Sequence, residues 1–286
     1  AGQVFAVVPD GVGGWYIGGG FTSVQGQHRM NLAHILASGA VDSWDPGVGG
    51  QLDPSGAGDG PVRALAVLDG GVYVGGEFGI VGGQPRNGLA KVDARTGLVT
   101  SWNPGANGPV LALAASDSTL HVGGKFTVIG GYYSPSLASF DARTGTLKLT
   151  RPSAVGGAVS ALATSGNPLY LGGEFDAIGF PTGGAALLDP STGYTRAPFL
   201  GVDGDVFAAA PDGSGGWYIG GAFRSVQGQP RANLAHILAD ATVGAWNPRA
   251  EGQMDPFDEG DGPIHALAVS GNTVYVGGDF GLINGE

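Results

Sequence analysis

A short apolar run followed by Gly-Gly-x-Phe occurs six times in this chain, and this repetition constrains the fold more than any other feature. The six copies read WYIGGGF, VYVGGEF, LHVGGKF, LYLGGEF, WYIGGAF and VYVGGDF, and they end at Phe21, Phe78, Phe126, Phe175, Phe223 and Phe280. Successive phenylalanines lie 48 to 57 residues apart. A period of this length is typical of propeller blades, whereas leucine-rich and hexapeptide solenoids have much shorter coils.

Each unit contains four short apolar runs separated by turn residues. In the second unit these are Val62–Gly70, the Val-Tyr-Val-Gly-Gly run, Asn87–Gly97 and Leu98–Pro104. None has the 3.6-residue period of a helix. The chain has 57 glycines among 286 residues and is still 42% hydrophobic, as expected of many short strands joined by tight turns. We therefore predict an all-β protein, a β-propeller of four-stranded blades.

The blades are predicted to form a single domain over residues 1–286, with five full blades and one partial blade. Their approximate bounds are 4–61, 62–109, 110–158, 159–205, 206–263 and 264–286. Units one and five match at an offset of 202 residues, as do units two and six, so a four-blade module begins to repeat. The sixth unit has only two of its four runs. We expect the missing strands to come from a longer chain or from a partner, another copy included, because an open strand edge accepts strands.

The recurring glycines, aromatic residues and aspartates are interpreted as structural. The glycine pair would allow close backbone approach or a bulge with positive φ, and the phenylalanine after it would pack between blades. Trp44, Trp102 and Trp246 end the fourth run and are predicted to clamp adjacent blades, with sugar stacking as the alternative. Asp-x-x-Thr-Gly at Asp93–Gly97, Asp141–Gly145 and Asp189–Gly193 is predicted to form hairpin turns.

Charge and composition exclude several functions. The formal charge is −11 with only 13 Lys and Arg, so there is no basic stripe for nucleic acid. The absence of cysteine excludes disulfides and thiolate metal sites. There is no apolar run of 18 residues, so no transmembrane segment is predicted. The low charged content of 13% favours a secreted or cell-surface protein.

No catalytic constellation is recognisable, and we predict neither catalytic residues nor a cofactor. His34 and His236 are repeat equivalents, which indicates a strand position. Glu77, Glu174 and Asp279 share one slot, where Arg29, Arg86 or Arg231 could pair with them. Calcium is the one metal considered, since it prefers oxygen ligands; a solvated acidic turn is the alternative. The candidate ligands lie in two acidic glycine-containing loops and are Asp53, Asp59, Asp255, Asp258, Glu259 and Asp261.

The unit VYVGGEF…GGQPRNGLAKVDARTG…WNP resembles the delta-60 type β-propeller repeat of bacterial secreted and surface proteins. The resemblance covers essentially the whole chain and implies a propeller fold in an extracellular setting, with no catalytic residues to transfer. The fourth unit departs most, because it lacks the Arg-Asn-Leu segment and the tryptophan. A weaker resemblance is to the tryptophan-docked repeats of quinoprotein-like propellers.

These features together predict a non-enzymatic scaffold for protein interactions, secreted or displayed on a bacterial surface. Its sharper form is self-assembly into an extracellular filament through the incomplete last blade. The alternatives are a propeller that binds a glycan or protein ligand, and a carbohydrate-active or quinone-dependent enzyme on the same fold.

Overall fold

The computed structural model describes residues 2–51, 60–148, 154–155, 157–164, 169–175, 177–178, 180–181, 185–188, 201–253 and 262–285. These ranges contain strands, bridges and turns and no helix, and every strand pair among them is antiparallel. The chain divides into two compact units, Ala1–Leu149 and Thr150–Glu286.

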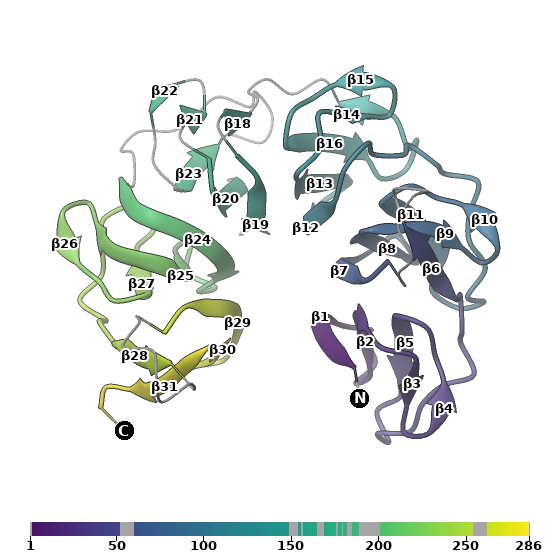
Figure 1. Cartoon of the computed structure of the whole chain (residues 1–286), viewed down its shortest axis with the longest axis horizontal. Helices are drawn as coiled ribbons and strands as arrows, with labels where there is room; N and C mark the ends of the chain where they lie inside the picture. Colours follow the sequence, from purple (N-terminus) through teal and green to yellow (C-terminus); the bar gives the residue numbers. More distant parts are fainter. Residues whose placement is uncertain are drawn as a thin grey trace. The chain divides into compact units, whose positions relative to one another are not determined.

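Three sheets of the first unit, taken in chain order, are here called blades 1 to 3 (Figure 1). Blade 1 consists of β1 (Gln3–Pro9), β2 (Trp15–Gly20) and β5 (Leu32–Ile35). Blade 2 consists of β7 (Val62–Leu68), β8 (Gly71–Gly76) and β11 (Leu89–Asp93). Blade 3 consists of β12 (Val110–Ser116), β13 (Thr119–Gly124), β16 (Leu137–Asp141) and β17 (Leu147–Lys148).

The second unit contains blades 4 to 6. Blade 4 consists of β19 (Val159–Thr164), β20 (Leu169–Gly173) and β23 (Ala185–Leu188). Blade 5 consists of β24 (Val202–Pro211), β25 (Trp217–Val226), β26 (Gln229–Pro230) and β27 (Leu234–Ile237). Blade 6 consists of β29 (Ile264–Ser270) and β30 (Thr273–Gly278), which pair only with each other among the described residues.

The fourth strand of a blade is much shorter than the sequence predicts. It is the two-residue β17 in blade 3 and a single bridge in blades 1, 2 and 5, for example Val92 with Val99. In blades 1, 2 and 5 a tryptophan, a polar residue and a proline follow within a few residues of the bridge. The pairing ends at the bridge, five residues before the proline, and the proline itself has no amide to donate to a ladder.

A second set of smaller sheets and hairpins lies beside the blades. The remaining strands are β3 (Ser23–Val24), β4 (Gln27–His28), β6 (Val48–Gln51), β9 (Phe78–Val81), β10 (Gln84–Pro85), β14 (Val128–Ile129), β15 (Tyr132–Tyr133), β18 (Ala154–Val155), β21 (Ala177–Ile178), β22 (Phe180–Pro181), β28 (Ala250–Gln253) and β31 (Phe280–Ile283). The segment that leaves blade 1, β6, pairs with β9 beside blade 2, and β28 pairs with β31 in the same way beside blade 6. At these two junctions the chain connects successive blades by hydrogen bonds as well as by its covalent link.

The apolar core lies between blades rather than inside any one sheet. One cluster joins Tyr16, Leu32 and Trp44 of blade 1 to Val62 and Val92 of blade 2. Equivalent clusters join blades 2 and 3, blades 4 and 5, and blades 5 and 6. The sheets carry apolar side chains on both faces. Each blade therefore buries these side chains by packing against its neighbours.

Candidate functional site

Neighbouring blades interlock through one side chain and one glycine, which repeat at a fixed register. The side chain belongs to a β-branched residue near the start of the first strand of each blade. In the register of the sheet, this residue is the partner of the second glycine of the Gly-Gly pair in the same blade. We call it the knob. The knobs of the described pairs are Val4, Val62, Val110, Val159, Val206 and Ile264. The first glycine of the pair faces the knob of the following blade at Gly18, Gly75, Gly172 and Gly220, and we call it the notch.

The notch has no room for a side chain where the next blade is in place. A Cβ atom added to Gly75 would lie 2.6 Å from Val110 Cγ1, and one added to Gly220 would lie 2.5 Å from Ile264 Cγ2. Gly18 faces Val62 and Gly172 faces Val206 in the same way. Val62, Val110, Val206 and Ile264 are fully buried. The glycine therefore creates the depression that each knob fills, and close approach is the reason for its presence.

The second glycine of each pair has a different task. A Cβ atom on Gly76, Gly124 or Gly278 would collide with the backbone carbonyl that precedes the knob of the same blade. The register shifts by one residue at this point in all six blades. The expected close approach and bulge are thus both present, whereas the alternative of positive φ does not apply to either glycine of these pairs.

Polar contacts cross the same blade interfaces. The tyrosine before the glycine pair donates to a carbonyl of the following blade, Tyr16 to Ala94 O and Tyr73 to Ala142 O, both at 3.1 Å. The tryptophan indoles also donate forward, Trp44 to Asp93 O at 3.1 Å and Trp102 to Gly145 O at 2.9 Å. The predicted clamp between blades is therefore observed for both tryptophans.

The Asp-x-x-Thr-Gly segments are turns, as the sequence indicates. Asp93 Oδ1 accepts from the Arg95 and Thr96 amides, and Asp141 Oδ1 accepts from the Arg143 and Thr144 amides. Gly97 and Gly145 complete the turns at φ of 74° and 73°, a region that glycine enters without strain. These turns supply the carbonyls that accept the tryptophan indoles. The third segment, Asp189–Gly193, lies outside the described residues.

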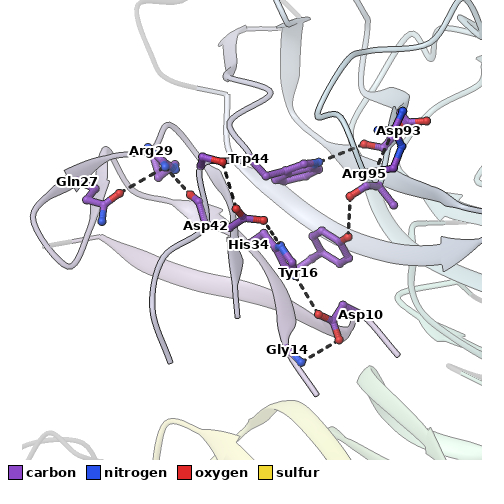
Figure 2. Close-up of polar contacts among 12 residues, drawn as sticks. Asp10, Gly14, Tyr16, Gln27, Arg29, His34, Asp42, Trp44, Asp93 and Arg95 are labelled. Carbon is purple, nitrogen blue, oxygen red and sulfur yellow. Dashed lines mark hydrogen bonds and ion pairs between the residues drawn. The ribbon is translucent and has the colours of Figure 1, made fainter. Parts of the chain in front are cut away.

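A histidine between two carboxylates supports the interface of blades 1 and 2 (Figure 2). His34 Nδ1 lies 2.7 Å from Asp42 Oδ2, and His34 Nε2 lies 3.0 Å from Asp10 Oδ2. The imidazole stacks on Tyr16, with 4.5 Å between ring centroids. The network thus fixes the phenol that donates to Ala94 in blade 2. Its buried position and full set of partners give it the character of a structural brace.

The second copy of the module keeps half of this brace. His236 Nε2 lies 2.9 Å from Asp212 Oδ2, and its ring stacks on Tyr218 at 4.2 Å. Gly244 stands where the first copy has Asp42. The sequence placed His34 and His236 on a strand correctly, but their carboxylate partners could not be paired with them without the fold.

His121 is a core histidine. It is buried between Ser139 Oγ, 2.8 Å from Nδ1, and Ser116 Oγ, 3.3 Å from Nε2. Burial lowers the pKa of His121 to about 4, with a further contribution from the Lys148 ammonium group. The side chain is therefore neutral at physiological pH.

We expect Asp42→Asn to weaken the first unit at neutral pH and to lose this effect in acid. The hydrogen bond from His34 holds the pKa of Asp42 below its ordinary value of 3.8. A depressed carboxyl pKa stabilises the fold above that value, and the stabilisation is lost as the pH falls through the folded-state pKa. The variant should cost about 1 kcal/mol at pH 7. Thermal unfolding followed by circular dichroism from pH 7 to pH 3 measures the difference.

The control for this substitution is Asp117→Asn, at an exposed turn of the same unit, which should leave stability within about 0.5 kcal/mol at every pH. A gap between wild type and Asp42→Asn that stays constant down to pH 3 would contradict the role of the carboxylate.

The predicted structural aromatics are placed as follows. Phe21, Phe78, Phe126, Phe175 and Phe223 are buried, and Phe280 is half-buried. Trp44 is buried, and Trp102 and Trp246 are half-buried. Trp102 packs edge-on against Tyr73 and Phe140, and Trp246 against Tyr218. These aromatic contacts favour packing over sugar stacking.

The calcium candidates Asp53, Asp59, Asp255, Asp258, Glu259 and Asp261 all lie outside the described residues. Within the described ranges no group of three or more His, Cys, Asp or Glu side chains is arranged to hold a metal ion. The same part of the chain holds no helix long and apolar enough to cross a bilayer.

The repeat position shared by Glu77, Glu174 and Asp279 is called the acidic slot. Two of its residues have other partners than the arginines that the sequence suggested. Glu77 bonds to Arg63 Nε at 2.7 Å, and Asp279 lies 2.9 Å from His265 Nε2, both partners being on the first strand of the same blade. The arginines expected there bind backbone instead: Arg86 donates to Pro85 O and Thr100 O, and Arg231 to Pro230 O and Gly244 O. Arg29 donates to Asp42 O and lies 3.7 Å from the Asp45 carboxylate. The predicted pairing of these three arginines with the acidic slot was therefore wrong.

One face of blade 1 and one face of blade 6 carry exposed side chains whose copies in other blades are buried. In blade 1, Val4 is 50% exposed and Trp15 is 48% exposed, whereas their copies in blade 5, Val206 and Trp217, are 0% and 1% exposed. In blade 6, Tyr275 is 59% exposed, whereas its copy Tyr73 is 1% exposed. These uncovered faces are the strongest candidate site among the described residues.

Comparison with known proteins identifies the fold. No known family profile matches the sequence, and no curated protein does. The extracellular domain of a putative one-component system from B. thetaiotaomicron is similar over 98% of this chain, which spans 32% of that protein's length, with TM-score 0.57 and 14% identity. A chain of the mitotic checkpoint complex is similar over 96% of this chain and 72% of its own, with TM-score 0.61 and 16% identity.

The WD40 domain of Neurospora crassa Pan2 is a third similar structure, over 97% of this chain and 89% of its own, with TM-score 0.57 and 12% identity. Likeness at such identities shows the fold alone. The chain is an all-β protein of β-propeller type, as its repeats predict.

Proposed function

We propose that this chain is a non-enzymatic scaffold of the delta-60 repeat type, which binds protein through the uncovered faces of blades 1 and 6. The observation that carries the proposal is the exposure of Val4, Trp15 and Tyr275, whose equivalents are buried between blades. An apolar sheet face of this kind is costly in water, and covering it releases free energy on association.

A secreted or cell-surface location belongs to the same proposal. The low charged content and the likeness to a bacterial extracellular domain support it. The non-enzymatic character is supported by the roles of the conspicuous polar residues, since the carboxylates of Asp10, Asp42 and Asp93 hold turns and a brace.

Self-association of the purified protein tests the proposal. We expect a mass above the 28.5 kDa of one chain, rising with concentration, in light scattering at micromolar protein. Electron micrographs should then show regular particles or fibres, the filament form of the proposal. A single species of one-chain mass that is unchanged up to the highest soluble concentration would overturn self-association.

A further inference from the structure

A polar pocket of about 370 Å³ lies at the junction of blades 2 and 3, within the first unit. Blade 2 contributes Lys91, Thr100 and Ser101 to its lining, and the turn of blade 3 contributes Arg143 and Thr144. None of the described residues that line it is acidic. Two cations and three hydroxyl groups thus gather at one place in a chain whose formal charge is −11.

The walls of this pocket are held by two of the hydrogen bonds between blades. The Tyr73 hydroxyl donates to Ala142 O at 3.1 Å, and the Trp102 indole donates to Gly145 O at 2.9 Å. All four of these residues also line the pocket. The pocket is therefore already formed in the folded chain, as ligand sites usually are.

The corresponding place between blades 1 and 2 holds the histidine brace that Figure 2 shows. Lys91 takes the register position of His34, opposite the tyrosine before the glycine pair. Thr100 N donates to Lys91 O, and Asp42 N donates to His34 O, both at 2.9 Å. Lys91 and Thr100 are therefore the structural equivalents of the histidine and of one carboxylate of the brace.

This exchange keeps the basic group and removes its carboxylate. Between blades 1 and 2 the Asp42 carboxylate lies 2.7 Å from His34 Nδ1. At the equivalent place Thr100 Oγ1 is buried and has no hydrogen-bond partner within the described ranges. The Lys91 ammonium lies over the Tyr73 ring, 5.0 Å from its centroid, and forms no ion pair or hydrogen bond with the described residues. The junction thus lacks the counter-charge that its equivalent contains.

The turn of blade 3 brings a second cation to the pocket. The Arg143 amide donates to Asp141 Oδ1, whereas its guanidinium has no ion-pair partner among the residues that the structure describes. The planar fork of arginine matches a carboxylate, and lysine adds a point charge. The hydroxyls of Ser101 and Thr144 can each donate and accept, as the hydroxyls of a sugar do.

We propose that this pocket binds a sugar acid, whose carboxylate gives Lys91 the counter-charge that Asp42 gives His34 and reaches Arg143 across the pocket. The volume exceeds what a carboxylate alone fills, and the hydroxyls of Ser101 and Thr144 suit the hydroxyl groups of the sugar. The inference is independent of the protein binding proposed for blades 1 and 6, because the pocket belongs to blades 2 and 3.

Titration calorimetry with sodium glucuronate tests the inference. Wild type should give a saturable heat that weakens with added NaCl, and neutral glucose should give none. Lys91→Met should weaken glucuronate binding by about tenfold or more, because a charge-assisted hydrogen bond is lost. The matched control is Lys125→Met, which removes the same charge from an exposed position of the same unit and should bind as wild type does.

Thr100→Asp tests the equivalence with the brace directly. The new carboxylate would stand where Asp42 stands between blades 1 and 2 and would pair with Lys91 within the chain. Glucuronate should then bind about tenfold more weakly or less, while the Tm at pH 7 stays equal to that of wild type or rises. Circular dichroism spectra and thermal unfolding of all the variants separate a loss of binding from a loss of folding.

Each contrary result overturns the inference at a definite point. A wild type that takes up no glucuronate at concentrations up to about 10 mM has no sugar-acid site of useful affinity. Lys91→Met and Thr100→Asp variants that bind as wild type does would place the ligand elsewhere. Inorganic phosphate that binds as tightly as glucuronate would show a site for anions in general and would overturn the sugar acid.

Discussion

Gly220→Val should destabilise the second unit by about 3 kcal/mol, a loss at the upper end of the usual cost of overpacking. The new Cβ atom would lie 2.5 Å from Ile264 Cγ2 and 2.9 Å from Ile264 Cβ, so blades 5 and 6 must separate or Ile264 must leave its position. Neither is cheap, because Ile264 is fully buried. Chemical denaturation followed by tryptophan fluorescence measures the change.

Gly277→Val is the matched control for this substitution, since it makes the same chemical change in the equivalent glycine of the next blade. With only Ala266 Cβ within reach, it should alter the stability of the isolated chain by less than about 0.5 kcal/mol. Equal losses for the two variants would show that the requirement for glycine is intrinsic to the strand, and the knob-and-notch explanation would then be wrong.

Phe78→Ala should have a still larger effect, about 4 kcal/mol, which corresponds to a fall in Tm of roughly 10 °C. Phe78 is fully buried in the cluster that contains Val48 and Trp44 of the preceding segment and Val81 of its own hairpin. Removing the ring leaves a cavity where blade 1, blade 2 and the β6–β9 link meet. Little of it can collapse, because hydrogen bonds between β6 and β9 hold its walls.

Phe280→Ala offers the comparison within the same repeat position. Phe280 is only half-buried, so its truncation should cost less than half as much. The two variants are compared by differential scanning calorimetry at one pH. A larger loss for Phe280 than for Phe78 would contradict the assignment of this repeat position to packing between blades.

The period, the strand order and the roles of the tryptophans could be predicted from the sequence because each rests on local pattern. Four runs per unit and an aspartate-glycine turn are visible in any one repeat. The β-branched residues in the knob register were equally visible, Val or Ile in all six units, but their partner is a glycine in another blade. A glycine shows no preference for a neighbour, so the pairing needed the structure.

Other features were missed for different physical reasons. The strands that link blades are two to four residues long, too short for a two-residue alternation to be recognised, as with β6 and β9. The brace around His34 joins side chains 8 and 24 residues away through contacts that only the folded sheet creates. The predicted fourth strand is reduced to a single bridge in blades 1 and 2. The pairing ends at Val41 and Val99, before Pro46 and Pro104 are reached.

The knob-and-notch contact is the same from one blade to the next, and this has an evolutionary consequence. Duplication of a gene segment that encodes whole blades creates new junctions whose two sides already fit, since Gly220 receives Ile264 as Gly18 receives Val62. Unequal recombination can therefore lengthen or shorten such an array without a compensating substitution, and the 202-residue offset is the trace that an event of this kind would leave.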